Sequence, residues 1–263
     1  MRGVVDVLFP MRCAGCSRGP WPFCPGCRSE LVLLSPPWCD RCGMPGEEHL
    51  AGCRHCPPAP VASARAPFLY AGPARAALLR LKWSGWRSVA DALGRAMTAV
   101  LDEENADAVT WVPLSAARRA RRGYDQARAL ARAVSRSTGR PSAALLARVR
   151  DTAPQSARSG RERRRAMKGA FRAIGRSSPS RVLLVDDILT TGATAAECAR
   201  VLRDAGADEV TVVTAARTTS WPLPTRCYTR PGSRPSLWLP GDPSPEVDAS
   251  RRRSDPRKGT VGS

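Results

Sequence analysis

Apolar residues follow two different spacings along this chain, and each spacing predicts its own kind of element. The stretch at 73–101, PARAALLRLKWSGWRSVADALGRAMTAVL, places them every three to four positions, which predicts helix, and Gly85 divides it into two helices. A second helical pattern, GATAAECARVLRDAGA, lies at 192–207. Short apolar runs predict buried strands at 108–114 (AVTWVPL), 181–187 (RVLLVDD) and 208–217 (DEVTVVTAAR).

Weaker patterns fill the chain between these elements. ARAPFLY at 64–70 and ALLARVR at 144–150 are further strand candidates, and 115–139 predicts a loop followed by a helix. The basic segment 151–171 predicts a loop with a helical turn at 160–167. Strands that alternate with helices predict an α/β fold, in which helices flank a parallel sheet.

Composition and charge bound the partners and the compartment. The chain has 263 residues, a formal charge of +19 and a pI of about 10.9, which favours polyanionic partners, although a GC-rich genome explains such an arginine excess equally well. Its apolar runs are shorter than the roughly 20 residues that span a bilayer. Asp6 interrupts the N-terminal apolar stretch, which does not match a signal peptide. We expect a cytoplasmic protein without membrane insertion, whose cysteines are reduced.

Eight of the ten cysteines form four Cys-x-x-Cys pairs within residues 1–58. The pairs are Cys13 and Cys16, Cys24 and Cys27, Cys39 and Cys42, and Cys53 and Cys56. Such a turn offers two thiolates to one tetrahedral ion, and two turns complete a four-cysteine site. The repeat therefore predicts two structural zinc sites, and a redox dithiol or an iron–sulfur cluster explains it less well.

The way in which the four pairs combine is open from the sequence. Sequential sites, the first pair with the second and the third with the fourth, compete with an interleaved cross-brace. The short gaps between the pairs favour the sequential arrangement. His55 lies inside the last turn and is expected to be a bystander, and PPAP at 57–60 ends the module.

The segment RVLLVDDILTTGAT at 181–194 carries the most specific candidate chemistry. Its apolar run does not alternate, as in a central parallel strand, and ligands bind beyond the carboxyl ends of such strands. Asp186 and Asp187 offer carboxylates to a vicinal diol, and Thr190–Thr194 lead into a helix N-terminus, which favours phosphate. The pattern predicts a ribose-phosphate site; the structural alternative is a solvated acid pair beside an ordinary helix cap. Walker A and dinucleotide glycine motifs are absent from the sequence.

This stretch resembles the phosphoribosyl pyrophosphate (PRPP) motif of type I phosphoribosyltransferases. With WVPLSAARRARRGYDQARALAR, RDTAPQ, RERRRAMKGAF and the cysteine pairs, it makes residues 5–217 similar to the ComF family of competence-associated proteins. The resemblance implies a type I phosphoribosyltransferase-like domain at 61–218, after the zinc-binding module at 1–58. The remaining residues, 219–263, are rich in proline, serine and basic residues, and we expect a disordered tail there.

The resemblance also implies roles for individual residues. Asp186 and Asp187 would hold the ribose and are the candidate catalytic residues. The 5′-phosphate would lie on Thr190, Thr191, Gly192, Ala193 and Thr194, and the pyrophosphate on Arg118, Arg121 and Arg122. Residues 150–165 would form a flexible loop that closes over the site. Tyr124 and Asp125 stand where the commonest family wording has Phe and Asn.

The implied reaction is displacement of pyrophosphate at the anomeric carbon of PRPP, through a transition state that resembles an oxocarbenium ion. Mg²⁺ bound with PRPP and the arginines would stabilise charge on the leaving oxygens. No base-binding hood is recognisable, so the acceptor stays open. One hypothesis is an active phosphoribosyltransferase linked to DNA uptake or processing. The other is a non-catalytic PRPP sensor, or an adaptor that binds single-stranded DNA and contacts other competence proteins.

Three basic clusters are candidates for contacts with single-stranded DNA. They comprise Arg118, Arg119, Arg121 and Arg122; Arg161, Arg163, Arg164 and Arg165; and Arg251, Arg252, Arg253, Arg257 and Lys258. Trp83 and Trp86 offer stacking faces, although their helical spacing favours core packing for at least one of them. Cys198 lies inside a predicted helix and is expected to pack rather than to react.

Overall fold

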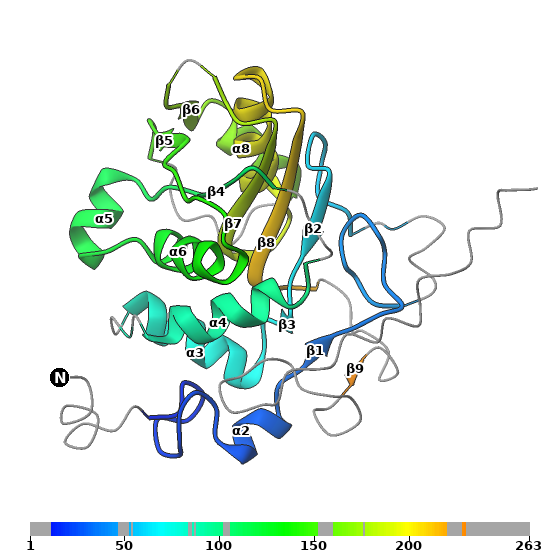
Figure 1. Ribbon diagram of the computed structural model, residues 1–263, viewed down its shortest axis with the longest axis vertical. Coiled ribbons are helices and arrows are strands. Elements are labelled where there is room, and N and C mark those ends of the chain that lie inside the picture. The colour runs from blue at the N-terminus through cyan, green and yellow to red at the C-terminus, as the bar shows by residue number, and fades with distance from the viewer. Residues whose placement is uncertain are drawn as a thin grey trace, which may run out of the picture.

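A seven-stranded sheet lies at the centre of the computed structural model, which describes residues 12–46, 53, 55–83, 86, 88–101, 106–151, 160–175, 177–219 and 228–229. Three neighbouring strands run parallel: β4 (Ala108–Trp111) at one edge of the sheet, then β7 (Arg181–Leu189) and β8 (Glu209–Arg217). On the far side of β8 lie β2 (Ser63–Arg65) and β3 (Phe68–Leu69), also parallel to it. Two short antiparallel strands, β1 (Leu33–Leu34) and β9 (Tyr228–Thr229), complete the sheet (Figure 1).

Helices cover both faces of this sheet, which confirms the predicted α/β class (Figure 1). One face carries α3 (Gly72–Trp83), α4 (Ser88–Thr98) and α6 (Gln126–Thr138), and the other carries α8 (Ala193–Asp204). The residues of β7 alternate between the two cores. Leu183 and Val185 join the first core, whereas Val182 and Leu184 join the second. Burial on both faces therefore explains the unbroken apolar run.

The segment 115–139 contains two helices, where the sequence predicted a loop and one helix. The first of them is α5 (Ala116–Arg122). Its N-cap is Ser115, whose hydroxyl accepts a hydrogen bond from the N–H of Arg118. It ends at Gly123, where a φ of 73° stops a right-handed helix. The local cap and stop signals at these two residues explain the additional helix.

The strand predicted at 144–150 is present, but it does not join the parallel sheet. It is β5 (Leu146–Arg148), which pairs in antiparallel fashion with β6 (Phe171–Ala173) to form a separate two-stranded sheet. The predicted helical turn before β6 is α7 (Gly160–Met167). The predicted loop thus begins and ends at one small sheet, although residues 152–159 lie outside the described part of the chain.

The acid pair lies inside β7 rather than beyond its carboxyl end, because the strand continues to Leu189. The pairing of β4 with β7 nevertheless stops at Trp111 and Val185, whereas β8 pairs on as far as Leu189. Asp186 and Asp187 therefore lie just past the end of β4, at the edge where ligands bind in open parallel sheets.

Some expectations concern residues that the structure does not describe. The predicted break at Gly85 falls outside the described ranges, although α3 and α4 are separate helices on either side of it. The predicted disordered tail, 219–263, is described only at Thr219 and in β9. Among the described residues, no helix has both the length and the apolar character to cross a bilayer.

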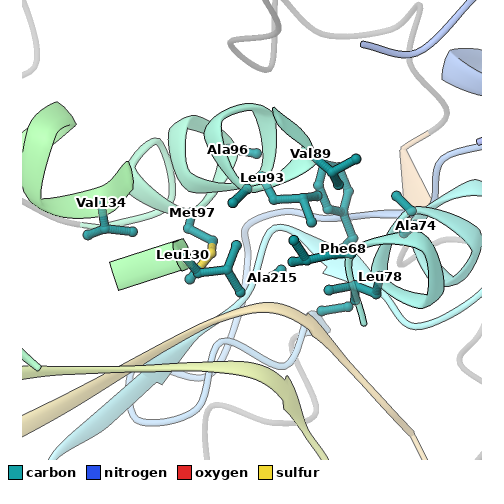
Figure 2. Close-up of a cluster of buried hydrophobic side chains, with 14 of the residues drawn as sticks. Phe68, Ala74, Leu78, Val89, Leu93, Ala96, Met97, Leu130, Val134 and Ala215 are labelled. Atoms are coloured by element: carbon teal, nitrogen blue, oxygen red, sulfur yellow. The ribbon is translucent and has the colours of Figure 1, made fainter. Parts of the chain in front are cut away.

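The first core depends on close contact between α4 and α6. Figure 2 shows Leu93 and Met97 of α4 beside Leu130 of α6. Gly94 lies at the contact, since a Cβ atom there would be 2.4 Å from Cβ of Ala133. Any larger residue at position 94 must therefore push the two helices apart.

We expect Gly94→Ala to lower the free energy of unfolding by about 1–3 kcal/mol, because the new methyl group overlaps that of Ala133. Urea unfolding followed by circular dichroism measures the loss. Adding Ala133→Gly should restore part of it, because the double change moves the methyl group across the interface. A single variant as stable as the parent would contradict the packing argument.

Candidate functional site

Two cysteine tetrads form in the N-terminal module, and both combine the pairs in sequence order. The first tetrad consists of Cys13, Cys16, Cys24 and Cys27, and its four Sγ atoms lie within 4.8 Å of one another. The Sγ atoms of Cys16 and Cys24 are 3.7 Å apart. Zinc–sulfur bonds of about 2.3 Å in tetrahedral geometry place sulfurs about 3.8 Å apart, so the spacing fits Zn²⁺.

The second tetrad consists of Cys39, Cys42, Cys53 and Cys56. Sγ of Cys39 lies 3.7 Å from Sγ of Cys56, and Sγ of Cys42 lies 3.4 Å from Sγ of Cys53. These separations exceed a disulfide bond of about 2.05 Å, so the thiols are unbridged. The backbone N–H of His55 donates to Sγ of Cys53, and its ring is not among the four candidate ligands, as expected. His49 lies outside the described residues.

Hydrogen bonding and burial change the acidity of the thiols. A hydrogen bond from the backbone of Gly19 lowers the pKa of Cys16 to about 6. Burial raises the pKa of Cys53 to about 11, and it raises the pKa of Cys27 and Cys56 well above the usual range. Four such thiols ionise together only beside a cation. The residues therefore fit structural Zn²⁺, the ion that four cysteine ligands favour.

The acid pair is half-buried and internally braced. The backbone N–H of Asp187 donates to Oδ1 of Asp186 at 2.8 Å. Burial, together with the charge of Asp187, raises the pKa of Asp186 well above its ordinary value. A ligand that donates hydrogen bonds to both carboxylates would relieve this unfavourable arrangement. The pair is thus partly desolvated and differs from a fully solvated surface pair.

Gln126, which the sequence interpretation did not single out, belongs to the same site. It is the first residue of α6 and is 5% exposed. Its Nε2 lies 3.5 Å from Oδ2 of Asp187, and its buried Oε1 has no hydrogen-bond partner within the described structure. A polar residue just after a helix cap is common, so no local signal distinguished it.

Residues 190–194 form a tight connection from β7 to α8, which we call the phosphate turn. Gly192 is its buried N-cap, with a φ of 72°, and its carbonyl accepts the N–H of Ala196 at 2.8 Å. The first N–H groups of α8 have no partner within the helix, and the helix dipole adds positive potential there. Thr191 and Thr194 are half-buried beside these groups, and Thr190 is exposed. The turn is thus suited to a phosphate.

Two of the three predicted pyrophosphate ligands stack on one indole ring. The guanidinium carbons of Arg121 and Arg122 lie 5.9 Å and 4.7 Å from the ring centroid of Trp83. Burial lowers the pKa of Arg122, and the charge of Asp187 opposes this shift. Arg122 therefore lies within electrostatic range of the acid pair. Arg118, also on α5, adds to the positive potential.

Arg148 of β5 joins the same electrostatic cluster, although no motif in the sequence marked it. Its guanidinium lies 5.2 Å from the ring of Phe171. Burial and the charge of Arg118 lower the pKa of Arg148, while the charge of Asp186 opposes them. It reaches this position through the pairing of β5 with β6, a contact that residue spacing along the chain does not indicate.

Asp125 has a structural role that explains its place in the sequence. It is buried at the N-cap of α6, where its carboxylate accepts hydrogen bonds from the N–H groups of Arg128 (3.1 Å) and Leu114 (3.3 Å). Burial raises the pKa of Asp125. Asn and Asp cap helices about equally well, so an Asn at this position would be compatible with the same cap.

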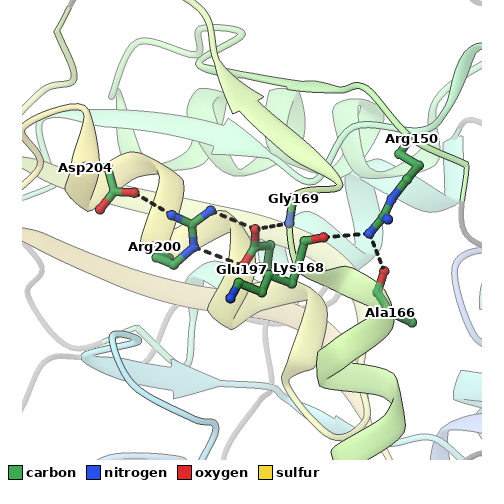
Figure 3. Close-up of polar contacts among 7 residues, drawn as sticks. All are labelled: Arg150, Ala166, Lys168, Gly169, Glu197, Arg200 and Asp204. Carbon is green, nitrogen blue, oxygen red and sulfur yellow. Dashed lines mark hydrogen bonds and ion pairs between the residues drawn. The ribbon is translucent and has the colours of Figure 1, made fainter.

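Hydrogen bonds fix both ends of the predicted flexible loop, at its first residue Arg150 and at Gly169 after it (Figure 3). Nη2 of Arg150 donates to the carbonyls of Ala166 (3.2 Å) and Lys168 (2.6 Å), at the end of α7. The N–H of Gly169 donates to Oε1 of Glu197 on α8 at 2.7 Å. The segment that follows the loop is therefore fixed to α8, the helix that begins at the phosphate turn.

A cavity of about 680 Å³ lies beside this region. Its walls include Trp111, Leu114 and Tyr124. Four arginines from α5, α6 and β5 also line it: Arg119, Arg128, Arg132 and Arg148. The guanidinium of Arg128 lies 5.5 Å from the ring centroid of Trp111. The cavity thus combines cationic groups with aromatic faces.

The remaining sequence candidates divide between surface, core and undescribed residues. Trp83 is 57% exposed, whereas Trp86 packs against the first core, as expected for one of the two. Cys198 is fully buried in α8, where burial raises its pKa, so it is a packing residue. The side chains of Arg161, Arg163 and Arg164 and the whole third cluster lie outside the described residues, as does Cys227.

Comparisons with known proteins support a zinc-binding module in the N-terminal part of the chain. Residues 4–57 match the double zinc ribbon domain. The chain is 32% identical over 210 residues to the DNA utilization protein YhgH of Escherichia coli strain K12, covering 76% of this chain and 92% of that protein. It is 30% identical over 223 residues to competence protein F of Haemophilus influenzae, covering 78% of this chain and 96% of that protein.

Among solved structures, the chain is similar to the glutamine PRPP amidotransferase from B. subtilis complexed with ADP and GMP. The TM-score is 0.35 and the identity 26%, over 48% of this chain and 26% of that chain. This chain therefore spans about a quarter of that longer one. The match to a double zinc ribbon, together with the two tetrads, supports structural zinc.

We expect the purified, reduced protein to contain two zinc ions per chain, measured by elemental analysis. Cys13→Ser with Cys16→Ser should leave one. Chelation should unfold the module, because so small a segment has little core of its own and depends on ligation for stability. Freshly purified protein without zinc would refute the assignment.

Proposed function

Because this chain belongs to the family of competence protein F and the DNA utilization protein YhgH, we propose that it binds PRPP and acts in the uptake or processing of DNA. In this proposal it transfers the phosphoribosyl group to an acceptor and releases pyrophosphate. The observation that supports it most is the arrangement around β7. The acid pair, the phosphate turn and an arginine cluster lie together past the end of β4.

Each part of PRPP has a counterpart among these residues. The ribose diol donates to Asp186 and Asp187, and Gln126 holds Asp187 in place. The 5′-phosphate accepts hydrogen bonds from the phosphate turn. The pyrophosphate faces Arg118, Arg121 and Arg122, with Arg148 close by. Mg²⁺ bound with PRPP would neutralise charge on the pyrophosphate, and the carboxylates nearby are ligands of the type that it prefers.

The chemistry is a displacement at the anomeric carbon. The bond from this carbon to the pyrophosphate oxygen breaks, and its electron pair leaves with the pyrophosphate. An acceptor nucleophile forms the new bond and gives up a proton. Arginines stabilise the negative charge that grows on the leaving oxygens, while the acids hold the ribose as it flattens towards an oxocarbenium ion.

A second function is favoured by the cavity beside the site, which matches the requirements for single-stranded DNA. Arg119, Arg128 and Arg132 are exposed around its aromatic walls. Phosphates pair with guanidinium groups, and bases stack on aromatic rings without sequence preference. In the non-catalytic alternative, PRPP binding regulates this DNA-binding surface. Release of pyrophosphate from PRPP in the presence of an acceptor distinguishes the enzyme from the adaptor.

We expect Asp186→Asn with Asp187→Asn to weaken PRPP binding strongly, because two charge-assisted hydrogen bonds are removed. Each is worth roughly 1.5–3 kcal/mol, or about 10- to 150-fold in affinity, and less where water reaches the carboxylate. Calorimetry in the presence of Mg²⁺ measures the change. A matched control, Asp204→Asn with Asp208→Asn, removes one acid at the end of α8 and one just before β8, and should bind PRPP normally.

The stability of the single variant Asp186→Asn, measured across pH, separates impaired binding from impaired folding. The pKa of Asp186 is raised in the folded chain, so the unfolded chain releases this proton first as the pH rises. Ionisation of Asp186 therefore destabilises the fold above the ordinary aspartate pKa, and the effect is complete above the raised value. Asp186→Asn should remove this loss and flatten the pH dependence of the unfolding free energy. A folded variant that binds PRPP normally would overturn the ribose site.

We expect Arg128→Ala with Arg132→Ala to weaken binding of single-stranded DNA and leave PRPP binding unchanged. For every DNA phosphate that the variant no longer neutralises, the log–log salt dependence of the affinity should become shallower by roughly 0.7. Fluorescence anisotropy with oligonucleotides across a salt series measures the slope. Arg136→Ala with Arg203→Ala removes the same charge from exposed positions outside the cavity and serves as the control. The proposal fails when no DNA complex forms even at low salt.

A further inference from the structure

The second tetrad reaches the phosphate turn through Pro57, the residue after its last cysteine. A Cβ atom on Gly192 would lie 2.7 Å from Cβ of Pro57 and 3.2 Å from Cδ of Pro58. The two prolines therefore form a wall against the backbone of the turn. Position 192 requires glycine for two reasons. Its φ of 72° is strained for residues with a side chain, and the two prolines leave no space for a Cβ atom.

Arg217, the last residue of β8, joins the second tetrad to the strand that leads into the turn. It is 2% exposed, and its guanidinium donates to the carbonyls of Cys42 and His55. In the sheet, Arg217 is paired with Leu189, the last residue of β7 before the turn. The N–H of Thr218 donates to the carbonyl of Leu189 at 2.9 Å. One buried side chain thus connects the tetrad to the strand ends that flank the turn.

Further hydrogen bonds hold the second tetrad in this place. Nη2 of Arg41 donates to the carbonyl of Pro57 at 3.1 Å. Nη1 of Arg65, on β2, donates to the carbonyl of Asp40 at 2.7 Å. The N–H of Ala64 donates to the carbonyl of Arg41 at 2.8 Å. The loop between Cys39 and Cys42 is therefore fixed to the edge of the sheet.

The first tetrad is attached elsewhere. Arg80 of α3 donates to the carbonyls of Ala14 (2.8 Å) and Gly15 (2.7 Å) and to the hydroxyl of Ser17 (2.7 Å). A Cβ atom on Gly15 would lie 3.0 Å from Cβ of Pro73, in the first turn of α3. These contacts lead to α3 and not to the phosphate turn. The two tetrads therefore provide a matched comparison within one chain.

From this asymmetry we propose that Pro57 and Arg217 are positioning residues for the phosphate turn, and that metal occupancy of the second tetrad controls the affinity for the 5′-phosphate of PRPP. The inference rests on the proposed PRPP site and adds a means of regulation to it. Ligation fixes Cys56, the residue just before Pro57, and the loops whose carbonyls Arg217 binds. Loss of the metal frees these groups, and the turn then spends less time in its binding conformation. The apparent dissociation constant rises as the fraction of binding-competent chains falls.

Paired cysteine variants test the proposal. Cys39→Ser with Cys42→Ser removes the second metal site, and Cys13→Ser with Cys16→Ser removes the first. Elemental analysis should find one zinc ion in each. Calorimetry with PRPP and Mg²⁺ should show affinity reduced about tenfold or more for the second-site variant, and within about twofold of the parent for the first-site variant. Equal affinities in the two folded variants would overturn the coupling.

Amide hydrogen exchange at residues 189–196 supplies a measurement that needs no ligand. Exchange should be faster in the second-site variant than in the first-site variant, because only the former loses the wall behind the turn. Unchanged protection overturns the inference. A parent chain that retains two zinc ions and does not bind PRPP overturns the proposed function instead, and the exchange comparison still decides the coupling.

Variants that keep all eight cysteines cover the case in which a tetrad variant does not fold. Pro57 and Pro25 each follow a tetrad cysteine, Cys56 and Cys24. Pro57→Gly should keep two zinc ions and weaken PRPP binding about three- to tenfold, whereas Pro25→Gly, at an exposed position, should leave it unchanged. Equal PRPP affinities in these two variants contradict a positioning role for Pro57.

Discussion

The burial of β7 on both faces is the constraint on which the site depends. Its apolar residues divide alternately between two cores, and the run ends where β4 stops pairing with it. The chain then has to return over the second core, which α8 does by burying Cys198 and Leu202. The position of the phosphate turn is thus set by the packing of the helix that follows it. The half-buried acids lie just before that turn, where burial and the charge of Asp187 raise the pKa of Asp186.

Arginines with structural roles account for part of the positive charge. Arg80, Arg65 and Arg217 each donate to main-chain carbonyls of the N-terminal module, and the last two are almost fully buried. A guanidinium offers five donors in a fixed plane, so one side chain can satisfy several carbonyls in loops that have no ladder of their own. Among the described residues, a small apolar cluster that includes Leu34 and Met44 surrounds the second tetrad. We therefore expect metal ligation and the hydrogen bonds of these arginines to supply stability that a larger apolar core would otherwise provide.

Features formed by residues close together in the sequence can be predicted from it. Contacts between residues far apart in the sequence cannot. The cysteine pairs are short segments whose spacing alone predicts the two tetrads, and the burial of β7 on both faces is predicted by a single apolar run. The ribose and phosphate roles of the acid pair and the turn, which are equally local, stay predictions. Gln126 is invisible in this way, because its partner Asp187 is 61 residues away. Arg148 reaches the site through the pairing of β5 with β6, and no periodic pattern encodes that register. Arg217 looked like the ordinary end of a strand, since nothing nearby in the sequence identifies carbonyls of a distant loop as its partners.

The bond from Arg217 to His55 joins residues 162 positions apart, which has a consequence for the order of synthesis. A ribosome that adds about 5–20 residues per second completes the second tetrad roughly 8–32 s before it makes the residue that anchors it. During that interval the end of β8, to which the loops of the second tetrad are hydrogen-bonded, does not yet exist. All four cysteines of the second tetrad are thus synthesised well before the strand end that fixes their position, and the phosphate turn at residues 190–194 is synthesised between the two.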